Sequence, residues 1–200
     1  MATLAGCGEA GEDGASSADT SGSSSMSSSS ANASAGSEGE PEFESLIDHE
    51  VWEVVDEDDD PLAEHRPEEL DCGVGGWYLE SDGPELEVDT NLCNYLALAQ
   101  PSLRPIDVGD TLAIRFYHFD LVAPEPAEAH LRVTVDGNEV WDYEVEIPTD
   151  PENNKTPAAV FDETFAAEFS APLGSEVMLH VHNHGQNTWT FVDLAVAPGP

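Results

Sequence analysis

The sequence predicts an all-β domain, an antiparallel β-sandwich, behind a disordered tail rich in Ser, Gly and acidic residues. From about residue 50 onward, apolar residues alternate with polar ones, which is the period of a strand with one buried face. Turns rich in Pro and Gly separate these stretches, and convincing helical patterns are missing. Many short alternating segments between such turns are typical of sandwiches. We therefore expect the folded domain to occupy residues 46–200.

Nine segments of this domain are expected to be strands. In chain order they are 77–81, 85–90, 95–100, 111–122, 129–135, 139–147, 159–169, 176–183 and 188–196. A helix is an alternative for 159–169, but Pro157 and Pro172 bracket this segment closely.

The clearest element is a hairpin over residues 129–147. Its first strand alternates Leu and Val with His, Arg and Thr. Asp136-Gly137-Asn138 follows, and Asp-Gly between alternating runs is a strong hairpin signal. On the return strand, Trp141 and Tyr143 share a face with Val and Ile, so we expect both rings in the core.

The composition changes near residue 45. Residues 8–42 contain no aromatic residue, no Leu, Ile or Val, and no Lys or Arg. Such a segment cannot bury enough apolar surface to offset the entropy lost on ordering. We expect residues 8–45 to form a disordered acidic linker.

The charge of the chain is extreme, with 42 acidic side chains against 5 basic ones and a formal net charge of −37. Such a chain has almost nothing with which to displace counterions from phosphates, so nucleic acid and anionic membrane surfaces are excluded as partners. The acidity either suits a salty medium, where the Debye length is about 3 Å at 1 M, or serves solubility alone. No run of 18 apolar residues is present, so we expect no segment to span a membrane.

The first residues suggest how the linker is attached. Residues 4–7, Leu-Ala-Gly-Cys, resemble the lipobox of bacterial lipoproteins, in which signal peptidase II cuts before the cysteine and this cysteine carries the lipid. The resemblance implies that residues 1–7 are a signal-peptide remnant and that Cys7 is lipidated. Only six residues, none of them basic, precede Cys7, so we expect the true start to lie upstream. The alternative is an ordinary cysteine in a disordered N-terminus. Gly8 in place of Asp implies delivery to the outer membrane.

Once Cys7 is assigned to a lipid, Cys72 and Cys93 remain as a pair. They flank two short predicted strands around a Ser-Asp-Gly-Pro turn. In an oxidising envelope compartment we expect a disulfide that closes a loop of roughly 20 residues and stabilises the fold by about 3 kcal/mol. The alternative is a pair of buried free thiols.

The order of the later segments resembles that of galactose-binding-like jelly rolls, which are common in bacterial carbohydrate-binding modules. In that family a Gly-Asp opens one core strand, and the closing strand carries an aromatic residue and an Asp. Gly109-Asp110, Phe191 and Asp193 stand in those places. The resemblance covers about 90 residues and implies a jelly-roll fold more than a particular ligand.

A sugar-binding sandwich needs exposed aromatic rings, because the CH face of a sugar stacks on them. Trp77 and Trp189 are the candidate ligand-binding residues, since they stand at strand starts beside Gly or polar residues. The alternative for both is a structural role.

The stretch MLHVHNHGQNTW places His180, His182 and His184 at alternate positions. Alternate residues of a strand point to one side about 6.5–7 Å apart, and the intervening Val and Leu fit the core. A Zn²⁺ or Cu²⁺ ion bound there needs a further ligand, which we expect from His130 or His118 on other strands. The alternative is a polar strand face whose histidines bond to neighbouring side chains and water.

No nucleophile elbow, P-loop, zinc-protease or paired-cysteine motif is present, so we expect no catalysis. We predict a lipid-anchored protein of the cell envelope, at the outer membrane or cell surface, that displays a binding module for a glycan or a protein. The alternative is a transition-metal-binding protein or metalloenzyme that uses the histidines.

Overall fold

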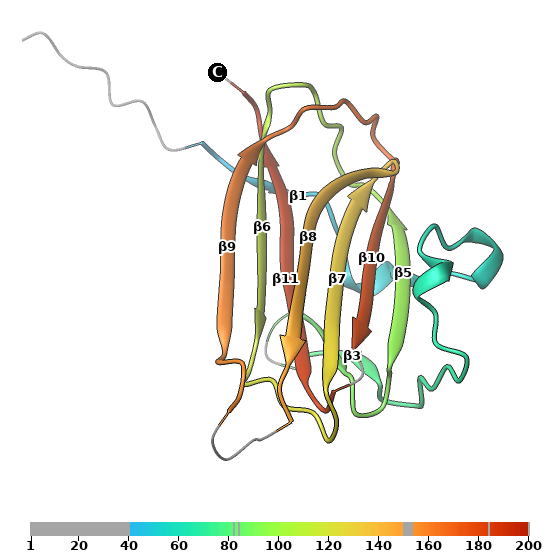
Figure 1. Ribbon diagram of the computed structural model, residues 1–200. Helices are drawn as coiled ribbons and strands as arrows, with labels where there is room; N and C mark the ends of the chain where they lie inside the picture. The colour runs from blue at the N-terminus through green and yellow to red at the C-terminus, as the bar shows by residue number, and fades with distance from the viewer. Residues whose placement is uncertain (1–40, 82, 84, 150–153, 184, 200) are drawn as a thin grey trace, which may run out of the picture. The chain divides into compact units, whose positions relative to one another are not determined.

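The computed structural model describes residues 41–81, 83, 85–149, 154–183 and 185–199, which form two antiparallel sheets facing each other (Figure 1). The predicted anchor Cys7, the signal remnant 1–7, the linker up to residue 40 and His184 lie outside the described residues. Within the described residues, no helix is long and apolar enough to cross a membrane.

The six-stranded sheet has the order β3-β4-β11-β6-β9, and β1 pairs with β11. Its strands are β1 (Glu44–Ser45), β3 (Trp77–Leu79), β4 (Leu86–Asp89), β6 (Thr111–His118), β9 (Ala159–Ala166) and β11 (Thr188–Ala197).

The five-stranded sheet has the order β2-β5-β10-β7-β8. Its strands are β2 (Glu53–Val54), β5 (Tyr95–Pro101), β7 (Ala127–Val135), β8 (Asn138–Ile147) and β10 (Glu176–Asn183). Three short 3₁₀ turns, η1 (His49–Val51), η2 (Glu57–Asp59) and η3 (Ala63–His65), lie between β1 and β3. From β5 to β11 the chain passes repeatedly from one sheet to the other, as in a jelly roll.

All nine predicted strands are present, so the antiparallel sandwich is confirmed. The helical alternative for 159–169 is wrong, because Ala159–Ala166 pairs with β6 along its whole length. The paired part of the chain begins at β1, two residues before the predicted boundary at 46.

The core lies between the two sheets, where the alternating apolar residues meet. Phe116 of β6 stacks on Trp141 of β8 with ring centroids 5.5 Å apart, and on Phe191 of β11 at 5.3 Å. Trp141 is buried and Tyr143 packs partly buried against this core, as the alternation of β8 predicts.

The β7–β8 hairpin turns at Asp136 and Gly137, with φ of 51° and 74°. Both values are positive, as in the type I′ turn that matches the twist of a hairpin. The Asp-Gly prediction is therefore confirmed at its two central positions.

Cys72 and Cys93 form a disulfide, so the prediction of a bridge is confirmed and the free-thiol alternative is wrong. The bridge ties the chain that follows η3 to the residues just before β5.

Candidate metal centre

The outer face of the five-stranded sheet carries two rows of polar side chains. The antiparallel register places His182 beside both Tyr95 and His130 in one row. In the next row, His180 lies beside Ala97 on one side and Arg132 on the other. Valine and leucine alternate with these residues and face the core, so strand parity alone brings the histidines to one side.

A segment of the chain then folds over this face. We call residues 57–66 the strap; it runs from η2 through η3 and ends at Arg66. The strap lies on the β5 side of the sheet, in teal in Figure 1. Val55, just before the strap, donates its N–H to the Ala97 carbonyl at 2.9 Å. In this way the strap brings His65 onto the histidines of the sheet.

Three imidazoles from three separate segments converge here. One ring nitrogen each from His65, His130 and His180 lies within 4.8 Å of the other two. The ring centroids are 5.0 Å apart for His65 and His130, 5.6 Å for His65 and His180, and 5.1 Å for His130 and His180. Imidazole nitrogens are the ligands that Zn²⁺ and Cu²⁺ favour in proteins.

His180 is the most buried member of the cluster, with 1% of its surface exposed. Burial, together with the neighbouring His130, His182 and His65, lowers the pKa of His180 to about 2. The ring is therefore neutral at physiological pH and keeps a lone pair. Neither of its nitrogens has a hydrogen-bond partner among the described residues, and a buried polar group in that state is costly unless a ligand satisfies it.

The carboxylate of Asp142 orients the ring of His130. Its Nε2–H donates to Asp142 Oδ1 at 2.7 Å, and Arg132 donates to the same oxygen at 2.6 Å. Burial alone would raise the pKa of Asp142, but the hydrogen bonds from Arg132 and His130 hold it below its usual value. The Nδ1 of His130 has no partner in the described structure, so it is the nitrogen left for a metal.

His65 is held in place through its neighbour Arg66. The Arg66 Nε donates to Asp60 Oδ2 at 3.0 Å, and the Tyr95 hydroxyl donates to the same carboxylate. The guanidinium also lies over the Tyr95 ring at 5.0 Å, and the Tyr95 hydroxyl reaches the Leu62 carbonyl at 3.1 Å. These contacts anchor the strap to the first residue of β5.

The structure brings together two of the predicted metal ligands, His180 and His130. His182 lies beside them, with its ring 6.3 Å from those of His180 and His65. The expectation for His118 is wrong: β6 belongs to the other sheet, and His118 points into the core against Trp189 at 4.5 Å. The alternation of β6 places His118 on the same face as Leu112, Ile114 and Phe116, so the strand pattern itself favoured the core for this residue.

His65 is the functional residue that the sequence analysis missed. It lies in the stretch DPLAEHRP, which has neither the period of a strand nor that of a helix. Its placement depends on how the strap crosses the sheet. The one available signal was its position shortly before Cys72, whose bridge to Cys93 leads toward β5.

The predicted sugar-stacking residues are not free platforms. Trp189 has none of its surface exposed and packs in the core, so its assignment as an exposed ligand-binding residue is wrong. Its register with Val88 and His118 turns the indole inward. Trp77 is partly buried against the core from β3.

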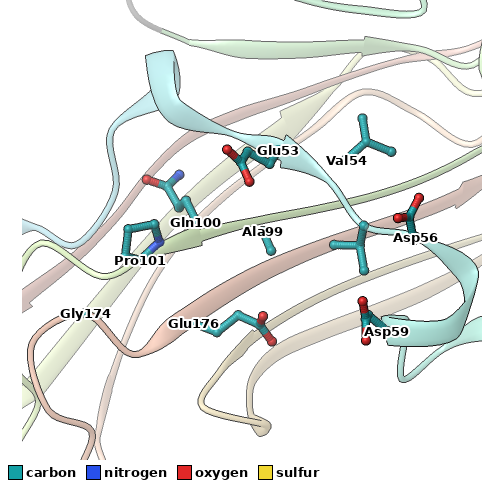
Figure 2. Close-up of a pocket in the computed structure, with 10 residues that line it drawn as sticks. Glu53, Val54, Asp56, Asp59, Ala99, Gln100, Pro101, Gly174 and Glu176 are labelled. Carbon is teal, nitrogen blue, oxygen red and sulfur yellow. The ribbon is translucent and has the colours of Figure 1, made fainter.

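An open cavity of about 560 Å³ lies near the strap, between β2 and the start of β10 (Figure 2). Figure 2 shows the carboxylates of Asp56, Asp59 and Glu176 along it. Its lining contains neither a histidine nor an aromatic ring. This cavity is therefore neither the predicted metal site nor a surface for stacking sugars.

No protein-family model matches the chain, and no curated protein matches it either. Similar solved structures include the Agl-KA catalytic domain, at 13% identity and a TM-score of 0.36, over 58% of this chain and 22% of that one. The N-terminal cellulose-binding domain from Cellulomonas fimi beta-1,4-glucanase C has 18% identity and a TM-score of 0.34, over 65% and 92%. A CBM4 structure has 13% identity and a TM-score of 0.33, over 64% and 94%. At this level of similarity, neither activity nor ligand transfers to this chain.

Proposed function

We propose that this protein binds one transition-metal ion, Zn²⁺ or Cu²⁺, through His65, His130 and His180. The observation that carries this proposal is the buried His180, whose two nitrogens lack hydrogen-bond partners among the described residues while its ring faces two further imidazoles. Neutral imidazole is the form that ligates metal, and the depressed pKa of His180 keeps it in that form.

The distances support an ion that pulls the three rings together. Tetrahedral nitrogens at 2.0–2.1 Å from Zn²⁺ lie about 3.3 Å from one another. The three nitrogens are within 4.8 Å, so each needs to move by only about 1 Å or less toward a common centre. Three protein ligands leave one coordination position for water or for another donor.

Calorimetric titration of the full chain with ZnCl₂ at pH 7.5 tests this proposal. We expect one tight equivalent in the wild type and at least a 100-fold weaker affinity in the double variant His130→Gln, His180→Gln. His49→Gln is a matched control, because His49 is buried elsewhere, between Trp52 and the Val192 carbonyl. Equal affinity in the wild type and the double variant would contradict the proposal. Ca²⁺ should bind weakly, since it prefers oxygen.

A second candidate function, glycan binding, has its own support on the outer face of the six-stranded sheet. The register places Tyr78, Glu87, Thr190 and Tyr117 side by side across β3, β4, β11 and β6. Phe119 is 61% exposed, and its ring stands nearly perpendicular to that of Tyr117 at 6.0 Å. We propose this face for a neutral glycan, since rings supply stacking and carboxylates accept hydroxyl protons.

Affinity electrophoresis through gels that contain neutral polysaccharides tests the glycan proposal. The wild type should be retarded, and the double variant Tyr117→Ala, Phe119→Ala should migrate freely. Val54→Ala is the control, because Val54 is 60% exposed and lies on β2 of the other sheet. Equal retardation of the wild type and the double variant would remove this face from consideration.

We propose further that Cys7 carries a lipid and tethers the domain to the cell envelope. The lipobox-like residues 4–7 and the Ser- and Gly-rich stretch behind them support this proposal. The chain expressed in a bacterial host behind a supplied signal peptide that leads into residues 4–7 should give a palmitate-labelled product. Labelling that persists in Cys7→Ser would contradict the anchor.

A further inference from the structure

The strap has little of its own to hold it on the sheet. Its backbone hydrogen bonds in the described structure are local, such as His65 N–H to the Leu62 carbonyl at 2.9 Å and Arg66 N–H to the Ala63 carbonyl at 3.1 Å. Leu62 is its only buried apolar side chain. The strap therefore depends on side-chain contacts with the sheet.

Its charge opposes docking as well. Five of its ten residues are acidic, namely Glu57, Asp58, Asp59, Asp60 and Glu64. They approach a sheet whose outer face carries Asp142 and Glu144, in a chain of net charge −37. Arg66 neutralises only Asp60 among them. A cation between the strap and the sheet would offset this repulsion.

The histidine cluster is built across this same junction. His130 and His180 belong to two paired strands and are fixed by the sheet, whereas His65 belongs to the strap. An ion that gathers the three nitrogens from within 4.8 Å to about 3.3 Å therefore draws His65, and the strap with it, toward the two strand histidines. That movement presses the strap onto β5 and β10.

We propose that metal binding at this centre fastens the strap to the sheet, so that metal binding stabilises the docked strap and a docked strap raises metal affinity. This inference rests on the proposed metal site. Arg66 acts as a positioning residue, because its contacts with Asp60 and Tyr95 hold His65 near the sheet before the ion arrives. The metal then adds coordination bonds that link the strap, through His65, to His180 of β10 and His130 of β7.

Hydrogen-exchange mass spectrometry on the full chain tests the coupling. One equivalent of Zn²⁺ should slow exchange across residues 57–66 at least 10-fold in the wild type. His65→Gln should bind Zn²⁺ more weakly and, even at saturation, should show no slowing in the strap. Glu57→Gln, which keeps every ligand, should behave as the wild type or show slightly more protection.

The outcomes separate this inference from the proposed function. If the wild type binds no Zn²⁺ tightly, both fail. If it binds one equivalent while exchange across the strap stays unchanged, the metal site stands and the coupling is wrong. The same holds if His65→Gln at saturation shows the full slowing, because the strap would then dock without its ligand. For Arg66, the positioning role predicts that Arg66→Lys keeps most of the wild-type Zn²⁺ affinity and that Arg66→Gln loses it. Equal affinity in the wild type and Arg66→Gln would contradict this role.

Discussion

At the scale of single residues, His180 links the burial of an imidazole to a response to pH. Burial lowers the pKa of its ring to about 2, whereas an unfolded histidine titrates near 6.5. Below pH 6.5 the unfolded chain takes up a proton that the folded chain refuses, so stability falls as the pH falls. Above pH 6.5 both states are neutral and the effect vanishes.

We therefore expect the metal-free protein to lose stability between pH 7.5 and pH 5.0, with about 2 kcal/mol of the loss due to His180. Urea unfolding at the two pH values, compared with His180→Gln, measures this share. The variant should lose about 2 kcal/mol less, because its glutamine does not titrate. The buried His49 and His118 contribute equally to both proteins and cancel. An identical pH dependence in the two proteins would contradict the role of His180.

Asp142 carries a second prediction at this scale. Its carboxylate holds the Nε2–H of His130 and so leaves Nδ1 for the metal. Asp142→Asn keeps the shape but removes the charge, and Zn²⁺ affinity should fall roughly 10- to 100-fold. Competition with a chelator of known affinity measures the change. Glu146→Gln is the control, because Glu146 is another exposed carboxylate of β8. An equal loss of Zn²⁺ affinity in both variants would point to a general charge effect.

Single residues also show how far the sequence determines the site. Alternation along a strand is local, so it predicted correctly that His180 faces away from the core. It could not show that His180 is covered, because the strap crosses the sheet from a distant and aperiodic part of the chain. The prediction that Trp189 is an exposed ligand-binding residue was wrong for a similar reason. Polar neighbours in the sequence do not reveal that the strand register turns its ring inward.

At the scale of elements, the strands followed from their patterns, but irregularities within them did not. In β11 the register shifts between Phe191 and Asp193. Trp189 and Phe191 face inward before this bulge, and Leu194 and Val196 face inward after it. A register shift of one residue moves the following side chains to the opposite face of the strand. No residue type in this stretch predicts such a bulge. Strands β1 and β2 were missed because two residues are too short for any period.

The β7–β8 turn gives the prediction for this scale. Gly137 has φ of 74°, where an L-residue crowds its own carbonyl. Gly137→Ala should lower the free energy of unfolding by about 1–2 kcal/mol, measured by urea titration. Gly73→Ala is the control, since Gly73 has no positive φ and an added Cβ would lie 3.8 Å from its nearest neighbour, an ordinary contact. Equal losses at both positions would show that the turn geometry is not the cause.

At the scale of the whole molecule, charge is distributed in an unusual way. Every one of the five basic residues forms an ion pair: Arg66 with Asp60, Arg104 with Glu44, Arg115 with Asp162, Arg132 with Asp142 and Lys155 with Asp120. Two of these pairs adjoin the histidine cluster: Arg66–Asp60 next to His65, and Arg132–Asp142 next to His130. Arg132 also approaches Glu139 at 3.5 Å, but five basic residues cannot balance 42 acidic ones. The mutual repulsion of the carboxylates favours the unfolded chain.

This balance predicts how the protein responds to salt. Raising NaCl from 0.05 M to 1 M shortens the Debye length to about 3 Å and screens both the ion pairs and the repulsion. Exposed pairs contribute only about 0–1 kcal/mol each, and there are five basic residues against 42 acidic ones, so the loss of repulsion should dominate.

The midpoint of urea unfolding should therefore rise with NaCl in the metal-free protein. KCl at the same concentrations should give the same rise, because screening depends on ionic strength, whereas sucrose at matched osmolality separates screening from exclusion effects. A midpoint that stays constant or falls between 0.05 M and 1 M NaCl would show that the acidic surface does not limit the stability of this fold. With Zn²⁺ bound, the salt-induced rise should be smaller, because the ion already offsets repulsion at the strap.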